Sequence, residues 1–594
     1  MEEVKSKKVV DNVQQFKACV DPKYSYAFGQ SSRPLIYKTL GAMLDETCEK
    51  FPDRMAVIST HEDYQATFQQ LKSDVDSLAF WLVNSLRIAR GDVIVTMTGN
   101  TYKSLILQFV AAKIGAILYP INAFYTKHEV EFSLNKVNPK MFIIPGPESE
   151  QEKCINRFHL LVTSIVEKLP KSLEYIVLLD GKQQTENIGK AKVLMFDDLM
   201  QSARNINQMN ESSETDINNN ASPPEFNDPD SPALLLSTSG TTGPPKAAIL
   251  SHFNIINNGQ MMGYRAGMTE GSRVCLPVPL FHSFGAVVGV VPIVTQGCTT
   301  VLIGYRYSAE AVTSAIIGHE CTHLLSVPAM MIDILDYLDK NKHLSITSLT
   351  HVLAAATLVP YQVAEKMSKV VNSLKTIDIA YGATEASPGI TVPISSDSLY
   401  DKLDNVGLPL DHVEVKIIDQ VSGEMVKIGE KGELLARGHN IFMGYWNDET
   451  QTKACMNKAH WYKTGDLATM DSKGYIRIVG RLKDIIIRGG LNIYPGEIED
   501  ALISHPLISF SAVFGIPDDR LGEEICAWIK FRDESKKLTE EQVIKFCKEK
   551  MAYFKVPRKL VFVTEFPTTA SGKVQKYRMK EISMSMFNQV QTKS

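Results

Sequence analysis

Several features that mark particular classes of protein are missing from this chain of 594 residues. Charge of one sign does not dominate, because 63 Lys and Arg face 67 Asp and Glu and the net charge is -4. This balance excludes the basic footprint of a nucleic-acid-binding protein and a polybasic membrane patch. The longest apolar run covers only residues 285–294 and contains Pro292, whereas a membrane-spanning helix needs about 20 residues. We therefore expect no transmembrane segment.

Cysteine is sparse and follows no pattern. The nine cysteines are scattered, and no two have C-x-x-C spacing, which excludes the disulfide framework of a small secreted domain and predicts core thiols. No arginine precedes Arg33, and the first residues contain neither a secretory apolar core nor the Arg-rich stretch typical of a transit peptide. This composition favours the cytoplasm. With 44% hydrophobic and 22% charged residues, the chain is expected to be globular.

Residues 92–146 alternate between apolar runs and amphipathic stretches. The runs DVIVTMTGN, ILYPIN and MFIIPG are typical of buried strands. Thr126 and Glu129 have the spacing of a capping box, which predicts the start of a helix. The β-α-β-α-β order predicts a parallel sheet covered by helices. In contrast, residues 203–230 are crowded with Asn, Ser, Asp and Pro, which predicts a solvated loop.

A glycine- and hydroxyl-rich segment, STSGTTGPPK at residues 237–246, follows a strand-like apolar run. Small residues let backbone N–H groups approach a polyphosphate, hydroxyl groups donate hydrogen bonds, and Lys246 supplies a cation. The spacing is not that of a Walker A loop. A flexible linker is the alternative, but linkers seldom leave a buried strand and end in Pro-Pro-Lys. We interpret the segment as a phosphate-binding loop.

The T-S-G-T-T-G-x-P-K pattern resembles the signature loop of the adenylate-forming superfamily, which includes acyl-CoA synthetases, firefly luciferases and the adenylation domains of peptide synthetases. Further motifs similar to those of the superfamily follow in order: PLFHSFG (279–285), VPAM (327–330), YGATE (381–385), YKTGDL (462–467), GRLKD (480–484), GGLNIYP (489–495) and PTTASGK (567–573). The resemblance covers about residues 41–580. The phrases LSHFN and IIRGG are most similar to those of medium-chain acyl-CoA synthetases.

The resemblance implies an α/β fold. A large N-terminal domain with stacked sheets covered by helices and a β-rich subdomain would be followed by a small, mobile α+β C-terminal domain. The implied boundaries are an extension over residues 1–40, the AMP-binding domain over 41–480 with its polar loop at 203–230, and the lid over 481–594. Relatives of this subfamily imply a mitochondrial location, in contrast to the N-terminal composition.

The implied activity is the ligation of a medium-chain fatty acid to coenzyme A, with ATP and Mg²⁺, through an acyl-adenylate. Adenylation is needed because a carboxylate is a poor electrophile until its oxygen becomes part of a leaving group such as AMP. AMP and pyrophosphate are the other products. Two alternatives stay open: an adenylating ligase or luciferase-like oxidase with a different acceptor, and a catalytically silent acyl-nucleotide binding protein.

The resemblance also assigns roles to individual residues of the ATP site. Glu385 would hold Mg²⁺, and Thr384 would donate to the α-phosphate. Tyr381 and Gly382 would lie near adenine, while Asp466 and Arg481 would bind the ribose. The phosphate loop itself would contribute Thr238, Ser239, Gly240, Thr241, Thr242, Gly243 and Lys246.

Four residues would act in the two half-reactions. Lys573 would bridge the carboxylate and the α-phosphate as negative charge builds during adenylation. Lys483 would lie at the hinge about which the small domain turns. After that rotation, Gly490 would line the pantetheine tunnel, and His282 would lie beside the carboxyl group and the coenzyme A entry.

One motif points elsewhere. Residues 319–323 read HECTH and fit the H-E-x-x-H pattern of zinc peptidases, which needs both histidines on one helix. The following apolar residues lead at once to Pro328, so we predict that a helix ends near His319 and that a strand follows. Zinc binding by this motif is not expected.

The sequence departs from the superfamily pattern in two places. Ala247 follows Lys246 where glycine is usual, and Ala354, Ala355 and Ala356 stand where Gly-Gly-Ala is usual. The implied location of the three alanines is against the adenine and the acyl channel. Each added methyl group is close in size to one substrate methylene, so we interpret the alanines as a specificity device.

Overall fold

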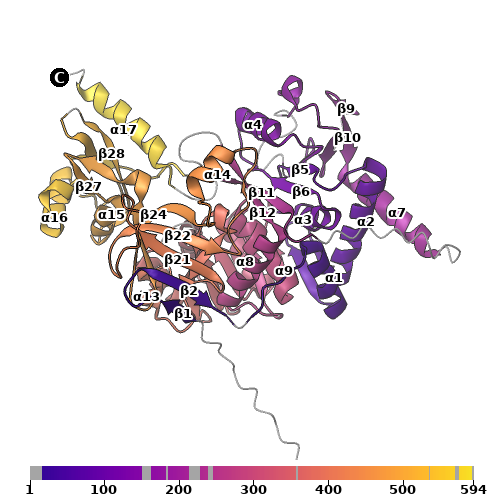
Figure 1. Ribbon diagram of the computed structural model, residues 1–594, viewed down its shortest axis with the longest axis horizontal. Helices are drawn as coiled ribbons and strands as arrows, with labels where there is room; N and C mark the ends of the chain where they lie inside the picture. Colours follow the sequence, from indigo (N-terminus) through magenta and orange to yellow (C-terminus); the bar gives the residue numbers. More distant parts are fainter. Residues whose placement is uncertain are drawn as a thin grey trace, which may run out of the picture.

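The computed structural model describes residues 17–31, 33–149, 151, 162–181, 185–212, 228–238, 245–355, 359–518, 520–533, 535–568 and 574–591. Within these ranges the strands form five sheets. Figure 1 shows the C-terminal elements, coloured orange to yellow, at one end of the molecule. The opposite end holds the helices α1 (Leu40–Lys50), α2 (Phe68–Leu86) and α7 (Phe196–Ser212).

The largest sheet has nine strands and contains the segment over which a parallel sheet was predicted. Strands β5, β6 and β7 are parallel neighbours, which confirms the predicted β-α-β-α-β order. The connecting helices are α3 (Tyr102–Ile114) and α4 (Lys127–Val137), and the Thr126 N–H donates to the Glu129 carboxylate as the capping box predicts. In spatial order the strands are β23 (Gly444–Tyr445), β12 (Lys246–Ser251), β11 (Pro232–Thr238), β6 (Ile117–Pro120), β5 (Val93–Thr96), β7 (Met141–Ile144), β8 (Tyr175–Leu178), β10 (Ala191–Met195) and β9 (Asn187–Ile188).

A second, seven-stranded sheet is parallel except for its last strand. Loops that leave the carboxyl ends of its strands contain several predicted site motifs, as is usual for open α/β sheets. Its strands are β17 (Thr376–Ile379), β16 (His351–Ala354), β15 (His323–Ser326), β13 (Arg273–Leu276), β14 (Thr299–Leu302), β3 (Met55–Ser59) and β4 (Tyr64–Thr67). The helices between and beside them are α8 (His252–Arg265), α9 (Val291–Gln296), α10 (Ala309–Gly318), α11 (Pro328–Lys340), α12 (Tyr361–Val370) and α13 (Leu399–Asp404).

A six-stranded antiparallel sheet joins the first described strands to strands within residues 413–481. The first strands belong to it, because β2 pairs with β21, so residues 17–30 of the predicted N-terminal extension are part of the folded body. Figure 1 shows these indigo strands beside the orange ones. The strands are β1 (Lys17–Val20), β2 (Tyr26–Gln30), β21 (Val413–Ile418), β22 (Gly432–Gly438), β24 (Tyr462–Met470) and β25 (Ile476–Arg481).

Two smaller sheets complete the molecule. A three-stranded sheet consists of β18 (Tyr381–Gly382), β19 (Gly389–Val392) and β20 (Leu408–Pro409). The small C-terminal α+β domain has its own core around Ile486, Ile525 and Val543. Its elements are β26 (Ile486–Arg488), β27 (Leu491–Ile493), α15 (Pro495–Ile503), β28 (Ile508–Asp518), β29 (Gly522–Phe531), α16 (Glu540–Lys550), β30 (Lys559–Phe562) and α17 (Lys576–Gln591).

The loop predicted for residues 203–230 starts later than the sequence indicated. Helix α7 continues to Ser212, so the first ten residues of this range are helical. The first turn of the helix contains Asp197 and Asp198, whose charges stabilise a helix N-terminus, and the helix packs against α2. The polar composition therefore concealed a helix with one covered face, and residues 213–227 lie outside the described residues.

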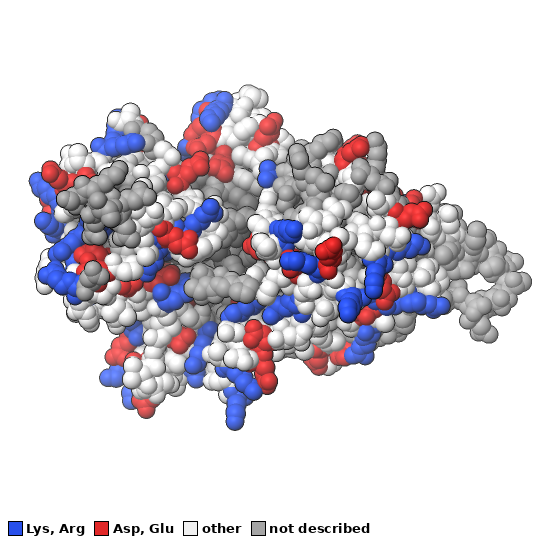
Figure 2. Space-filling model, turned by 90° about the horizontal axis from the view of Figure 1, so that it is seen from above, with Lys and Arg blue, Asp and Glu red and all other residues white. Residues whose placement is uncertain are grey.

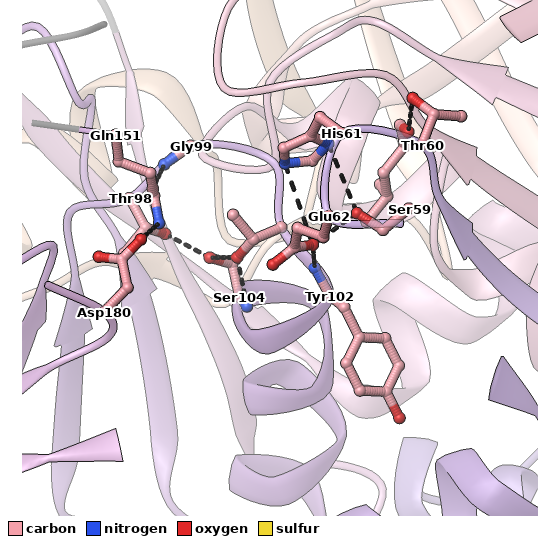
Figure 3. Close-up of polar contacts among 12 residues, drawn as sticks. Ser59, Thr60, His61, Glu62, Thr98, Gly99, Tyr102, Ser104, Gln151 and Asp180 are labelled. Atoms are coloured by element: carbon pink, nitrogen blue, oxygen red, sulfur yellow. Dashed lines mark hydrogen bonds and ion pairs between the residues drawn. The ribbon is translucent and has the colours of Figure 1, made fainter. Parts of the chain in front are cut away.

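A polar network holds the carboxyl ends of β3 and β5 against the start of α3 (Figure 3). The Glu62 carboxylate accepts from the Tyr102 N–H at 2.7 Å and from the Ser59 hydroxyl at 2.5 Å. Farther along, the Gly99 N–H donates to the Gln151 side chain at 3.0 Å. The Glu62 carboxylate thus satisfies the N–H group of the first residue of α3 and joins the end of β3 to the start of this helix.

The surface and the thiols agree with the composition. Lys and Arg alternate with Asp and Glu over the face shown in Figure 2, without an area of a single sign. Among the described residues, no helix is long and apolar enough to cross a membrane. The prediction that most cysteines are core residues is confirmed for Cys48, Cys275, Cys298, Cys321, Cys526 and Cys547, which are buried.

Candidate active site

The phosphate-binding loop predicted from the sequence connects β11 and β12. These strands are antiparallel, and Thr238 lies opposite Lys246, so the structure places the two ends of the loop side by side. The intervening candidates Ser239, Gly240, Thr241, Thr242 and Gly243 lie outside the described residues. The Lys246 ammonium donates to the Gln451 side-chain oxygen at 2.6 Å. A cation is therefore held where the loop returns to the sheet.

Three predicted nucleoside-binding residues, Tyr381, Asp466 and Arg481, meet in one cluster, here called the nucleoside cluster. The Tyr381 hydroxyl donates to one carboxylate oxygen of Asp466 at 2.7 Å, and the Arg481 Nε lies 3.0 Å from the other. Burial, followed by the charge of Asp466, raises the pKa of Tyr381 well above its usual value, so this residue stays a neutral donor. The cluster offers both acceptors and donors to a polar ligand.

Strand pairing explains how residues far apart in the sequence form this cluster. Asp466 on β24 lies directly opposite Arg481 on β25 in the antiparallel register, and cross-strand pairs of opposite charge stabilise each other. Tyr381 reaches them from β18, whose next residue is Gly382. A Cβ atom at Gly382 would lie 1.8 Å from the Pro388 carbonyl oxygen, so only glycine fits there.

Glu385 lies in a 3₁₀ turn over Thr384–Ala386 and is held from two sides. Its carboxylate accepts from the Tyr445 hydroxyl at 2.7 Å, and its carbonyl oxygen accepts from the Phe442 N–H at 3.0 Å. Glu385 is 8% exposed. The neighbouring Thr384 is partly exposed. A fixed carboxylate with a hydroxyl beside it on the chain is a donor set that suits a hard cation such as Mg²⁺.

His282 lies in the loop that follows β13, just before a π-helical turn at Phe284–Val288. Its Nδ1 accepts from the Phe284 N–H at 3.2 Å, which orients the ring. The same loop is anchored to the nine-stranded sheet, because the Leu280 N–H donates to Asn100 at 2.9 Å. The π-helical turn is a feature that recurs at functional sites.

The alanines that replace the usual glycines begin at the end of β16. Ala354 is fully buried, and its carbonyl oxygen accepts from the Ala380 N–H at 2.8 Å, just before Tyr381. Ala355 is partly exposed. Ala356 lies outside the described residues. The segment is thus joined through the backbone to the strand that leads into the nucleoside cluster.

The hinge and lid candidates lie beyond the nucleoside cluster. Lys483 follows Arg481 within a single 3₁₀ turn, and burial together with the Arg481 charge lowers its pKa. Gly489 and Gly490 form the turn between β26 and β27, with φ values of +58° and +80°. A Cβ atom at Gly490 would contact nothing within 4 Å, so space is open beside it. Lys573 lies outside the described residues.

The H-E-x-x-H motif does not lie on one helix. Helix α10 ends at Gly318 with His319 as its cap, and His323 starts β15, as predicted. His323 instead stacks on His351 with ring centroids 4.5 Å apart, and burial lowers the pKa of His323 to about 3. No group of three or more His, Cys, Asp or Glu in the described part of the chain is arranged to hold a metal ion.

Two residues beside the site did not stand out in the sequence. Tyr445 contacts Glu385 through its hydroxyl, and the Lys246 ammonium lies 4.9 Å from the centre of its ring. Gln451 bonds Lys246 from helix α14 (Glu449–Cys455). A tyrosine after an apolar strand is by default a core residue. The only signal was its position just before the turn that starts α14.

Comparison with known protein families agrees with this geometry. The family model described as AMP-binding enzyme matches residues 44–446, and the model described as AMP-binding enzyme C-terminal domain matches residues 497–573. The chain belongs to the AMP-binding enzyme family. It is an adenylating enzyme with the α/β fold of that superfamily, a large N-terminal domain and a small C-terminal one.

Similar proteins of this family are found in animals and bacteria. A Danio rerio protein named medium-chain acyl-CoA ligase ACSF2, mitochondrial, is 36% identical over 94% of this chain and 90% of its own length. Its Homo sapiens counterpart is 34% identical over 94% and 89%. A Bacillus subtilis protein named putative acyl-CoA synthetase YngI is 34% identical over 93% and 98%. The superfamily expected from the motifs is thus confirmed.

Solved structures show the same fold. An anthranilate CoA ligase, AuaEII, in complex with anthranoyl-AMP has a TM-score of 0.79 and 24% identity over 94% of this chain and 99% of its own. ATP-bound MatB from Rhodopseudomonas palustris has a TM-score of 0.75 and 23% identity over 92% and 98%. Both likenesses extend over the N-terminal body and the C-terminal domain.

Proposed function

We propose that this protein is an ATP-dependent acid–CoA ligase that converts a medium-chain fatty acid into its acyl-CoA through an acyl-adenylate. The observation that carries the proposal is the nucleoside cluster, in which three separate motifs supply Tyr381, Asp466 and Arg481 to one point. The animal relatives are named medium-chain acyl-CoA ligases, which supports the acyl-CoA product and the medium chain length.

In the proposed first half-reaction, a carboxylate oxygen of the acid attacks the α-phosphorus of ATP and pyrophosphate leaves. Asp466 and Arg481 would bind the ribose, and Thr238 and Lys246 would bind phosphate oxygens with the loop between them. Thr384 would donate to the α-phosphate. Lys573, whose ammonium is a point charge, would bridge the two reacting groups and stabilise the charge that develops between them.

The residues around Glu385 fit a magnesium ion. Mg²⁺ is usually held by one or two carboxylates together with substrate phosphates and water, not by a cage of protein ligands. Glu385 is such a single carboxylate, and Tyr445 bonds only its Oε1 atom. Bound there, the ion would offset phosphate charge as pyrophosphate leaves.

In the proposed second half-reaction, the thiol of coenzyme A attacks the acyl carbon and AMP leaves. Rotation about Lys483 would bring Gly490 to the thiol entry, where the open space beside this glycine leaves room for a thin pantetheine chain. His282, whose ring is oriented by the Phe284 N–H, would lie beside the reacting carboxyl group and the coenzyme A entry.

The test measures the two half-reactions separately. Purified protein with ATP and Mg²⁺ should release pyrophosphate only when a fatty acid is added, and coenzyme A should then cause AMP release and thioester formation. A series of acids from short to long should give its highest kcat/KM at medium length. Pyrophosphate without thioester would instead identify an enzyme with another acceptor, and ATP binding without pyrophosphate a silent binding protein.

A further inference from the structure

Two groups of opposite charge at the proposed ATP site contact the same tyrosine. Glu385 accepts from the Tyr445 hydroxyl at 2.7 Å, and the Lys246 ammonium lies 4.9 Å from the centre of the same ring. Among the described residues, the Lys246 ammonium has no carboxylate within ion-pair distance. Tyr445 therefore links the two charged groups, one through its hydroxyl and the other through its ring.

Tyr445 is firmly held in this intermediate position. It is 8% exposed, and its N–H donates to the Thr452 hydroxyl at 2.9 Å. Strand β23, which ends with Tyr445, pairs with β12, the strand that begins with Lys246. The backbone of Tyr445 is therefore fixed to the sheet edge that carries Lys246.

Gln451 completes the surroundings of Lys246. Its side-chain oxygen accepts from the ammonium at 2.6 Å, and Gln451 is exposed at the surface of α14. The helix is fixed to the sheet, because the Gln451 N–H donates to the capping Asp448 and Thr452 bonds Tyr445. The ammonium thus has one neutral acceptor and one aromatic face, both weaker partners for a cation than a phosphate is.

We infer that Tyr445 and Gln451 are positioning residues that form a seat for Lys246, from which the phosphates of ATP draw the ammonium. The inference rests on the proposed function for ATP as the nucleotide. The seat holds the Lys246 ammonium at the Gln451 oxygen and the Tyr445 ring, and it leaves the Glu385 carboxylate available for a cation. ATP binding then exchanges the Gln451 bond for a phosphate bond.

The first experiment varies the strength of the seat at Gln451 and measures ATP binding by calorimetry in the presence of EDTA. Gln451→Ala removes the competing acceptor and should tighten ATP binding by two- to fivefold. Gln451→Glu replaces it with a carboxylate and should weaken ATP binding about tenfold. Lys453→Gln is the matched control, since it changes the charge of the same exposed helix by the same amount, and it should change affinity by less than twofold.

A double-mutant cycle separates the seat from a general charge effect. In a Lys246→Met background, Gln451→Glu should change ATP affinity by less than twofold, because no ammonium is left to hold. If Gln451→Glu lowered ATP affinity equally in the wild-type and Lys246→Met backgrounds, the inference would be wrong. It would also be wrong if Gln451→Ala left ATP binding unchanged or weakened it. If the wild-type chain binds no ATP, the proposed function fails first.

The second experiment separates the two ends of Tyr445. Tyr445→Phe keeps the ring beneath Lys246, so ATP affinity in EDTA should stay within twofold of wild type. It removes the bond to Glu385, so the Mg²⁺ concentration that half-saturates the increase in ATP affinity should rise severalfold. Tyr445→Leu should weaken ATP binding in EDTA as well. If Tyr445→Phe and Tyr445→Leu changed ATP affinity in EDTA and the Mg²⁺ requirement equally, with unchanged melting temperatures, the inference would be contradicted.

Discussion

The two ends of the proposed nucleotide site are built in different ways. In the nucleoside cluster, both carboxylate oxygens of Asp466 already contact protein groups, and the residue is 7% exposed. At the phosphate end, Lys246 is partly exposed and donates to a single surface glutamine. The nucleoside end is therefore held together by bonds within the protein, whereas we expect the phosphate end to exchange partners when phosphates bind.

This difference follows from what each end has to recognise. A ribose is neutral and keeps its shape during the reaction. The Asp466 carboxylate can still accept hydrogen bonds from it after contacting Tyr381 and Arg481. The phosphates change their charge and bonding during the reaction. A preformed cluster therefore suits binding, and exchangeable cations suit chemistry. We expect variants of the two ends to alter different measurements.

The largest effect is expected from Lys573→Ala. Loss of a charge aimed at the reacting centre should lower the rate of pyrophosphate formation by about 10²–10³-fold. Conversion of supplied acyl-adenylate and coenzyme A into thioester should stay near the wild-type rate. Lys483→Pro should give the opposite pattern, because a stiffened hinge hinders rotation but not adenylation. Equal losses in both half-reactions would contradict this division.

Asp466→Asn should act mainly on binding. The substitution removes the negative charge that pairs with Arg481 and weakens acceptance from the ribose, so ATP affinity should fall by about 10–100-fold. Calorimetric titration with ATP measures the loss. The isosteric side chain should preserve the strand pairing, which circular dichroism checks. An affinity within twofold of wild type would show that ATP does not use this cluster.

Salt should distinguish the two ends at a smaller scale. Lys246→Met should lower ATP affinity about tenfold in dilute buffer. The difference in ATP affinity between this variant and the wild type should become smaller as salt is added, because the partly exposed ammonium is screened. Tyr381→Phe removes a neutral, buried donor, so its effect should not vary with salt. If the loss of ATP affinity depended on salt concentration in the same way for both variants, the proposed difference between the two ends of the site would be wrong.

The smallest effect is expected from the alanines after β16. Ala354→Gly combined with Ala355→Gly should move the preferred acid by one or two carbons toward longer or bulkier chains, since one methylene is worth about 1–3 kcal/mol in an apolar pocket. Apparent ATP affinity should hardly change. Relative kcat/KM over a series of acids measures the shift. An identical profile would show that the backbone has absorbed the methyl groups.

Elements with a strong local signal could be predicted from the sequence. The run from β5 to β7, the capping box at Thr126 and the end of α10 before His323 all follow from periodicity and caps. The polar stretch after residue 203 was misleading, because α7 continues to Ser212 with little apolar character to reveal it. Residue composition identifies solvated surface better than it identifies the absence of a helix.

The candidate site shows the same limit. Tyr381, Glu385 and Asp466 stood out because their motifs resemble those of a known superfamily. Tyr445 did not, since its importance arises from the pairing of β23 with β12, in which Tyr445 lies opposite Ala248, far earlier in the sequence. Local periodicity contains no information about such a pairing. The hydroxyl bond to Glu385 became visible only with the fold.

The strand β2 has a consequence for synthesis of the chain on the ribosome. The Tyr26 hydroxyl donates to Glu414 at 2.7 Å across 388 residues of sequence. At about 5–20 residues per second, β2 waits roughly 20–80 s for β21 to be made. During this interval an unpaired strand edge is open to other chains. Chaperone protection of the free edge of β2 is therefore expected to matter more for this protein than for one in which both neighbours of an early strand follow soon after it in the sequence.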